Sequence, residues 1–159
     1  FADGAAAVVG VPTRNSENPE WIVQAQGAFL LPLSGDAMSW RIGDHGFRMT
    51  LSAAVPELIR TNLRGWLKDW LKGQGFRLND IGSWAVHPGG PRILEAVEDA
   101  LALENNILDV SRTVLRNHGN MSSPTVLFIL DRLRKTNATL PCVALAFGPG
   151  LVVEAMLVV

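Results

Sequence analysis

Residues 83–101 have the sequence SWAVHPGGPRILEAVEDAL, and this stretch decides the class of fold. Its first four residues, 83–86, are the kind of short, mostly apolar run that is typical of a buried strand. Pro91 suits the first turn of a helix, and apolar side chains then recur at helical spacing to about residue 103. The stretch therefore predicts a strand that leads through a polar turn, HPGG, into an amphipathic helix.

The second half of the chain repeats this alternation of strands and helices. Apolar residues recur with a period of 3.6 over residues 55–72, which predicts a helix with Pro56 in its first turn. Further helices are expected at about 110–118 and 125–135, and further buried strands at 142–147 and 151–159. Such an order of elements is typical of an α/β fold.

The first half of the chain carries weaker patterns. Residues 5–11 have no helical period and are expected to form a buried strand, and residues 12–19, PTRNSENP, are expected to form a turn. Residues 21–33 indicate one or two strands, broken at Gly27. The glycine- and aspartate-rich stretch 34–46, SGDAMSWRIGDHG, is expected to be a loop or a distorted hairpin.

Composition excludes several classes of protein. The 159 residues are 48% hydrophobic and 18% charged, which suits one globular domain or half of a larger one. The formal net charge of -1 gives no electrostatic footprint for nucleic acid or for a membrane surface. No apolar run reaches the roughly 18 residues that a membrane span requires. The single cysteine, Cys142, excludes an internal disulfide framework and favours a reducing, cytoplasmic setting.

Both ends of the chain are apolar. It begins at Phe1, without a Met, directly before the run AAAVV at 5–9, and it ends in the run MLVV at 156–159. Natural termini are usually polar and poorly ordered. We therefore expect this chain to be a segment of a longer protein.

Two polar clusters interrupt the apolar elements, HPGG at 87–90 and NHGNMSS at 117–123. His87 follows a predicted strand, and ligands of α/β sheets bind beyond the carboxyl ends of strands. Asn120 lies just before a predicted helix, whose N-terminal N–H groups favour negative charge. Gly119 is expected to end one helix and Ser123 to cap the next. A His and an Asn donor aimed at one oxygen would form an oxyanion hole.

These residues also have structural interpretations. A lone His after a strand is more often a hydrogen-bonded structural residue than a functional one. The spacings of the three histidines, at 45, 87 and 118, fit no metal-ligand motif. Cys142 lies inside an apolar strand, where a buried, inert thiol is expected. The sequence also contains no Ser-centred nucleophile elbow and no Gly-rich phosphate loop.

Three motifs together resemble a known family. HPGG from His87, GNMSS from Gly119 and FGPG from Phe147 recur in this order in the type III polyketide synthases, which are the chalcone and stilbene synthases and their bacterial relatives. The 33 positions from His87 to Asn120 are also similar to the family's spacing. The opening FADGAAAVVG resembles the strand at the start of the family's C-terminal half. The resemblance therefore covers essentially residues 1–159.

The resemblance implies a thiolase-like fold, in which two similar α/β halves pack into an αβαβα arrangement and form a homodimer. This chain would be the C-terminal half of an acyltransferase that uses acyl-CoA and malonyl-CoA, with no metal and no bound cofactor. His87 and Asn120 would be catalytic and would hold a thioester oxygen during a decarboxylative Claisen condensation. The catalytic Cys would belong to the absent N-terminal half, so the segment alone would be inactive. His118 is expected to be a bystander.

The resemblance also implies substrate-binding positions. Phe1 matches one aromatic gatekeeper of the family, and Met49 stands where the partner gatekeeper is aromatic. Trp40 corresponds to a small glycine that lines the plant cavity, so the cavity is expected to be smaller or reshaped. The remaining substrate-binding residues are expected to be Ser122, Gly148 and Pro149.

Two other interpretations stay open from the sequence. A β-ketoacyl carrier-protein synthase III-like condensing enzyme shares the fold and the Cys-His-Asn set, although its His and Asn motifs differ from HPGG and GNMSS. A non-catalytic α/β module that binds a partner protein belongs to another class altogether.

Overall fold

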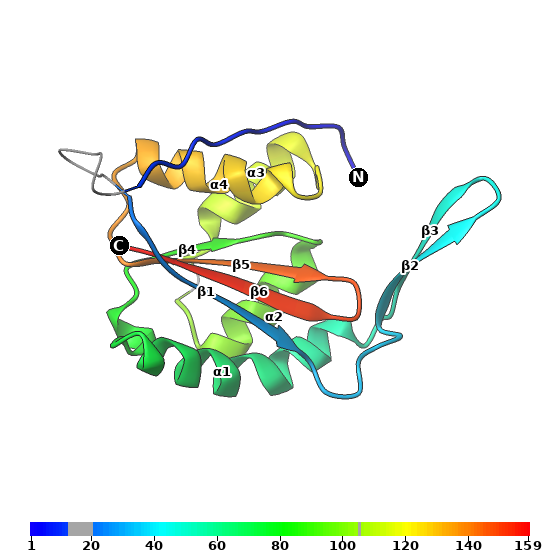
Figure 1. The fold of residues 1–159 in the computed structure, drawn as a ribbon, viewed down its shortest axis with the longest axis horizontal. Coiled ribbons are helices and arrows are strands. Elements are labelled where there is room, and N and C mark those ends of the chain that lie inside the picture. Colours follow the sequence, from blue (N-terminus) through cyan, green and yellow to red (C-terminus); the bar gives the residue numbers. More distant parts are fainter. Residues whose placement is uncertain (13–20, 105) are drawn as a thin grey trace.

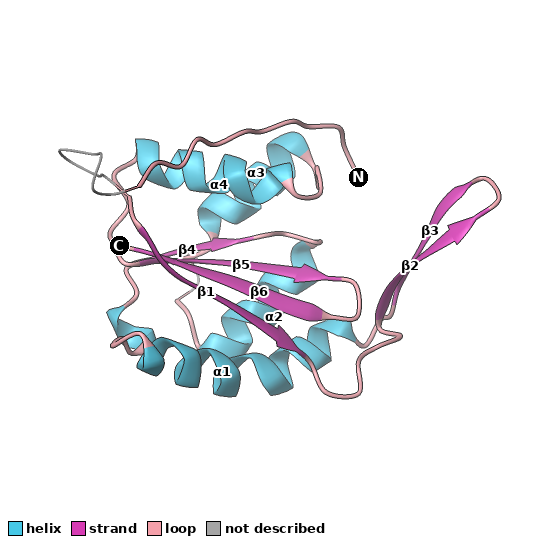
Figure 2. Ribbon diagram, viewed as in Figure 1, coloured by secondary structure: helices cyan, strands magenta, loops and turns pink. Residues whose placement is uncertain are grey.

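The computed structural model of the chain describes residues 1–12, 21–104 and 106–159. Helices cover both faces of a four-stranded sheet, and a two-stranded hairpin projects from one end (Figures 1 and 2). The predicted α/β class is confirmed. None of the helices in the described ranges is long and apolar enough to cross a membrane.

The sheet brings the ends of two strands to the same edge. Its order is β1 (Val23–Leu30), β6 (Val152–Val158), β5 (Cys142–Gly148) and β4 (Ser83–Val86). β6 runs antiparallel to both β1 and β5, whereas β4 and β5 run parallel. The turns that follow β4 and β5 therefore lie side by side.

Gly27 does not break β1, contrary to the expectation from the sequence. The strand continues through it, with Gly27 paired to Ala155 of β6. A Cβ at this position would lie 2.5 Å from the indole Nε1 of Trp70. Gly27 therefore allows close approach of the helix that carries Trp70, and the strand stays whole.

Two helices lie on each face of the sheet. α1 (Val55–Gly73) and α2 (Pro91–Leu101) cover one face, and α3 (Asp109–His118) and α4 (Pro124–Lys135) cover the other (Figure 1). The 3-10 helix η2 (Leu78–Asp80) leads from α1 into β4. The four α-helices agree with the predicted ones to within two residues at each end, because apolar periodicity marks them and α1, α2 and α4 also have a proline in their first turns.

The larger hydrophobic cluster lies between the sheet and the helices α1 and α2. The stripe predicted on α1 supplies its fully buried members Ile59, Leu63, Leu67 and Leu71. Trp66 and Trp70 pack against this cluster at its margin, stacked on each other with ring centroids 6.0 Å apart. A smaller cluster under α3 and α4 includes the buried Met121 and Cys142.

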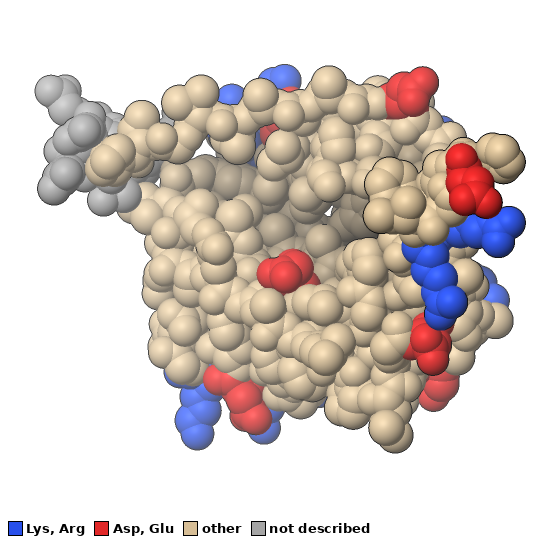
Figure 3. Space-filling view, turned by 45° about the vertical axis from the view of Figure 1, so that its right-hand side comes forward, with Lys and Arg blue, Asp and Glu red and all other residues tan. Residues whose placement is uncertain are grey.

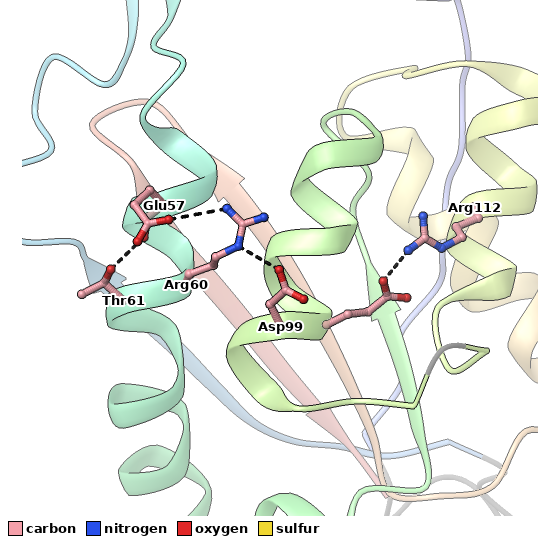
Figure 4. A network of polar contacts seen from close by, with 6 residues as sticks. Glu57, Arg60, Thr61, Asp99 and Arg112 are labelled. Carbon is pink, nitrogen blue, oxygen red and sulfur yellow. Dashed lines mark hydrogen bonds and ion pairs between the residues drawn. The ribbon is translucent and has the colours of Figure 1, made fainter.

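Polar contacts join three of the helices (Figure 4). Arg60 of α1 donates to Asp99 of α2 over 2.8 Å and lies 3.6 Å from Glu57. These exposed pairs add little to stability. Arg112 of α3 donates to Glu98 of α2, whose side chain is only 14% exposed. This more buried pair ties α3 to the helix that follows His87.

The prediction of a buried strand at residues 5–11 was wrong. This segment is exposed and forms no strand; it runs along α3 and α4 (Figure 1). Val8 and Val9 are 77% and 88% exposed. The reason is that a strand requires a hydrogen-bonding neighbour, and among the described residues none lies alongside this segment. Residues 13–19 of the predicted turn lie outside the described residues.

The stretch 34–46 was expected to be a loop or a distorted hairpin, and it opens a regular hairpin. β2 (Met38–Gly43) and β3 (Gly46–Leu51) pair without a bulge, with Trp40 opposite Met49. The hairpin extends beyond residue 46, because residues 46–51 form β3 and every one of them pairs with a residue of β2. It projects from the sheet and places Trp40 and Met49 on one cross-strand pair.

Candidate active site

A cavity of about 430 Å³ opens at the sheet edge where β4 and β5 end. Its walls come from the turn after β4, the turn after β5, the α3–α4 connection, the β2–β3 hairpin and the N-terminal segment. All the site residues predicted from the sequence line it, namely Phe1, Trp40, Met49, His87, Asn120, Ser122, Gly148 and Pro149. Figure 3 shows that the hollowed face of the molecule carries few charged side chains.

His87 extends the sheet by one residue beyond β4. Its backbone N–H donates to the carbonyl of Leu145 in β5 over 2.8 Å, and its own carbonyl accepts from Gly89 N–H at 3.1 Å. The second bond closes a tight turn, after which Pro91 begins α2. The ring is partly buried, and this burial lowers the pKa of His87 below its ordinary value of 6.5. Burial therefore favours the neutral imidazole over the charged one in this chain.

A buried serine holds the end of β4 that carries His87. β4 is an edge strand of the sheet in the described part of the chain, so the N–H of Val86 needs an acceptor outside it. Ser111 of α3 is fully buried, and its Oγ accepts from Val86 N–H at 3.2 Å. Nothing in the sequence marks this residue, because a serine inside a helical pattern gives no sign of a partner 25 positions away.

Replacing Ser111 by Ala should lower the free energy of unfolding by about 1–3 kcal/mol, because the buried Val86 N–H would lose its acceptor. Denaturant unfolding of the two chains measures the difference. Ser123→Ala is the matched control: Ser123 is exposed, makes no capping bond, and should change stability by less than about 0.5 kcal/mol. Equal effects of the two substitutions would contradict the assigned role of Ser111.

Asn120 lies in the four-residue connection 119–122 between α3 and α4. Gly119 ends α3 as predicted, with a φ of 73° that glycine adopts readily. The side-chain amide is held at both ends: its Oδ1 accepts from Ser122 N–H at 2.9 Å, and its Nδ2 donates to the carbonyl of Gly89 at 3.4 Å. Asn120 thereby links the two polar clusters and turns its amide N–H₂ toward the loop that follows His87.

The expected capping bond of Ser123 is not formed. Ser123 occupies the N-cap position of α4, but its φ and ψ of -51° and -40° are helical, whereas a capping side chain needs an extended backbone. Thr125 takes over instead, since its Oγ1 accepts from the N–H of Met121 at 2.9 Å. The buried Thr125, which the sequence analysis did not single out, thus anchors the connection at its α4 side.

The remaining walls of the cavity are mostly apolar. Trp40 and Met49 face each other across the hairpin, and Trp40 makes an edge-on contact with Phe47 at 5.7 Å. Glu154 of β6 is the one carboxylate side chain among the described lining residues. The arrangement is an apolar chamber with an imidazole and an amide along one wall.

Other candidate residues lie elsewhere. Cys142 is buried in β5, as predicted, and does not line the cavity; burial raises the pKa of its thiol. Among the described residues, no group of three or more His, Cys, Asp or Glu side chains could hold a metal ion. His45 lies at the tip of the hairpin, and His118 lies at the end of α3 outside the cavity lining.

The chain should lose stability in acid through His87. Its pKa is lower in the folded than in the unfolded state, so below about pH 6.5 the unfolded chain binds more protons. The free energy of unfolding is therefore expected to fall as the pH falls from 6.5 through the folded-state pKa. Thermal unfolding at several pH values measures this slope. His87→Gln should flatten it and His45→Gln should leave it unchanged; a slope that persists in His87→Gln would contradict the assignment.

Comparison with known proteins gives consistent matches. A family model described as "Chalcone and stilbene synthases, C-terminal domain" matches residues 22–159. A 1,3,6,8-tetrahydroxynaphthalene synthase of Streptomyces peucetius subsp. caesius is 41% identical over 164 residues, covering 99% of this chain and 43% of the relative. A bisdemethoxycurcumin synthase of Oryza sativa subsp. japonica is 39% identical over 171 residues, covering 99% of this chain and 42% of the relative.

The fold also matches a solved structure. The crystal structure of PKS-I from the brown alga Ectocarpus siliculosus superposes with a TM-score of 0.86 at 31% identity, covering 91% of this chain and 41% of the other. This match confirms the thiolase-like fold expected from the sequence. The chain spans less than half the length of the curated relatives that it matches.

Proposed function

The chain belongs to the chalcone and stilbene synthase family, the type III polyketide synthases, and from this premise we propose that it is the C-terminal half of an acyltransferase. The whole enzyme would condense malonyl-CoA with an enzyme-bound acyl starter. One observation carries the proposal: the amide of Asn120 donates to the loop that follows His87, and both residues line the same cavity. This placement supports a site in which both side chains would donate to one ligand oxygen.

In this proposal His87 and Asn120 form the oxyanion hole for malonyl-CoA. The thioester carbonyl oxygen would accept a hydrogen bond from the imidazole of His87 and one from the free N–H of the Asn120 amide. Loss of CO₂ sends the electrons of the breaking C–C bond onto that oxygen, and the two donors stabilise the resulting enolate. The electrons pass directly to the thioester, so the step requires neither a metal nor a redox cofactor.

The nucleophile would come from an N-terminal half of the same protein. Cys142 is unsuited to the role, since it is buried and burial raises the pKa of its thiol. A cysteine thiolate placed beside His87 would raise the pKa of the imidazole by charge attraction and oppose the effect of burial. The resulting ion pair would attack an acyl-CoA thioester, release CoA and form the acyl-enzyme. The malonyl enolate carbon would then attack that acyl group.

The same proposal places the enzyme in the cytoplasm as a homodimer, with acyl-CoA and malonyl-CoA as its substrates. The apolar character of the cavity supports an acyl or polyketide chain as its occupant. The motifs HPGG and GNMSS favour this proposal over a β-ketoacyl carrier-protein synthase, whose His and Asn motifs differ from them.

The test compares two malonyl donors with the intact enzyme, that is, this chain joined to its N-terminal half. We expect CO₂ release from malonyl-CoA and little from malonyl carrier protein. The reverse preference would favour the carrier-protein synthase and overturn the proposal. The 159-residue chain alone is expected to form no acyl-enzyme from acyl-CoA, and acyl transfer by the chain alone would contradict a nucleophile outside it.

The starter should differ from the coumaroyl thioester used by plant chalcone synthases. Trp40 and the thioether of Met49 line the cavity where a glycine and an aromatic ring are expected in plant members. The bulk of Trp40 should restrict the intact enzyme to a smaller starter or a shorter product. Product analysis by mass spectrometry measures this. Trp40→Gly should lengthen the products, whereas Ile42→Gly, on the same strand but outside the cavity lining, should not; efficient chalcone formation by the unmodified enzyme would contradict it.

A further inference from the structure

His118 is the last residue of α3, and its ring packs on one face of α4. The Nη2 of Arg132 lies 2.8 Å from the His118 Nε2, and the ring of Phe128 makes an edge-on contact with the imidazole at 5.4 Å. Phe128 and Arg132 are four residues apart and thus share a face of the helix. His118 is therefore held by two side chains of the next helix, although it does not line the cavity.

The chemistry of this contact fixes the state of the ring. A guanidinium can only donate hydrogen bonds, so the Nε2 of His118 must be the acceptor and the ring proton lies on Nδ1. A hydrogen bond from a charged donor is stronger than one between neutral groups. The contact therefore fastens the carboxyl end of α3 to the middle and last turns of α4.

This fastening lies directly before the connection 119–122 that carries Asn120. On the α4 side the connection is anchored by Thr125, which accepts from Met121 N–H. On the α3 side the neighbouring side-chain contact is that of His118 with Arg132 and Phe128. The bond from Asn120 to Gly89 is long, at 3.4 Å, and the 2.9 Å bond from Ser122 N–H to the Asn120 Oδ1 lies within the connection itself, so neither ties the amide firmly to the rest of the fold. The position of the amide consequently depends on how the two ends of the connection are held.

We propose that His118 and Arg132 act together as positioning residues for Asn120. This inference rests on the proposed function, in which the Asn120 amide donates to the malonyl thioester. It replaces the expectation that His118 is a bystander. Neither residue touches the substrate. Their contact fixes the position of the last residues of α3, and these residues in turn set the position and direction of the Asn120 side chain.

Three variants of the intact enzyme test the proposal. His118→Phe keeps the aromatic contact but removes the acceptor, Arg132→Met keeps the aliphatic bulk but removes the donor, and His118→Gln keeps an acceptor. The first two should lower kcat for malonyl-CoA decarboxylation about tenfold, because small misplacements of a reacting group are costly. KM should stay within about twofold. His118→Gln should retain most of the activity, and the double variant should be no worse than either single one.

Lys135→Met is the matched control, since Lys135 is exposed on the same helix and pairs only with Asp131 among the described residues. It should leave kcat unchanged. An unchanged decarboxylation rate in both His118→Phe and Arg132→Met would overturn the proposal. A loss of activity in His118→Gln as large as that in His118→Phe would overturn it as well.

A second measurement keeps this proposal separate from the proposed function. Hydrogen exchange of the backbone amides of 119–122 requires no turnover, and it should speed up about tenfold in His118→Phe and Arg132→Met while α1 stays protected. If the unmodified intact enzyme releases no CO₂, the proposed function fails, and the exchange rates alone decide the positioning role. Unchanged exchange in both variants would overturn it.

Discussion

Replacing either His87 or Asn120 by Ala should lower CO₂ release from malonyl-CoA by the intact enzyme about 10²- to 10³-fold. Each substitution removes one of the two donors that face the developing oxyanion. The effect should appear in kcat more than in KM, because the negative charge develops only as the C–C bond breaks. Since the two donors would serve one oxygen, the double variant should lose less than the product of the single losses.

The measurement is the initial rate of CO₂ release, together with product formation. His45→Ala and Asn79→Ala are the matched controls, because both residues are exposed and lie outside the cavity lining. Thermal unfolding of each variant shows whether the fold is retained. Near-normal CO₂ release from a folded His87→Ala or Asn120→Ala enzyme would contradict the assignment of that residue to the oxyanion hole.

Replacing Leu67 by Ala should lower the free energy of unfolding by about 2–5 kcal/mol. Leu67 is fully buried in the stripe with which α1 packs against the sheet. The substitution removes apolar contacts and leaves a cavity that the surrounding helix and strands can fill only in part. Domains of this size are stable by about 5–15 kcal/mol, so the variant should approach the limit of folding at room temperature.

Urea unfolding of this chain measures the loss, and the neighbouring Lys68→Ala is the control. Lys68 is exposed, and its substitution should change stability by less than about 0.5 kcal/mol. A loss below about 1 kcal/mol for Leu67→Ala would show that α1 is not packed as described.

The elements that the sequence predicted well are those whose apolar pattern alone decides their environment. α1 shows a period of 3.6 that only a helix can bury on one side, and Pro56 marks its start. β4 is short and fully buried, which its apolar residues indicate, and the glycines of the turn after it mark the end of the strand. The motifs HPGG and GNMSS then indicated which loops would meet, and the cavity contains residues of both.

The predictions that were wrong depend on partners distant in the sequence or on local dihedral angles. Residues 5–11 have the composition of a strand, but strand formation depends on a neighbour that a composition does not specify. Ser123 has the right chemistry to cap α4, yet its helical backbone turns the hydroxyl away. The bond from Asn120 to Gly89 spans 31 positions, and Ser111 serves a strand 25 positions earlier. Neither contact leaves a periodic trace in the sequence.

The pairing of β1 with β6 also bears on how the protein folds as it is synthesised. Val23 pairs with Val158, so β1 is the first of the described strands to be made and its partner is the last. β6 also lies between β1 and β5, so β1 cannot join the sheet until β6 has been synthesised. Contacts between such distant residues slow folding, and unpaired strand edges can associate between chains in the meantime. Growing chains are therefore expected to need protection from aggregation until residue 158 has left the ribosome.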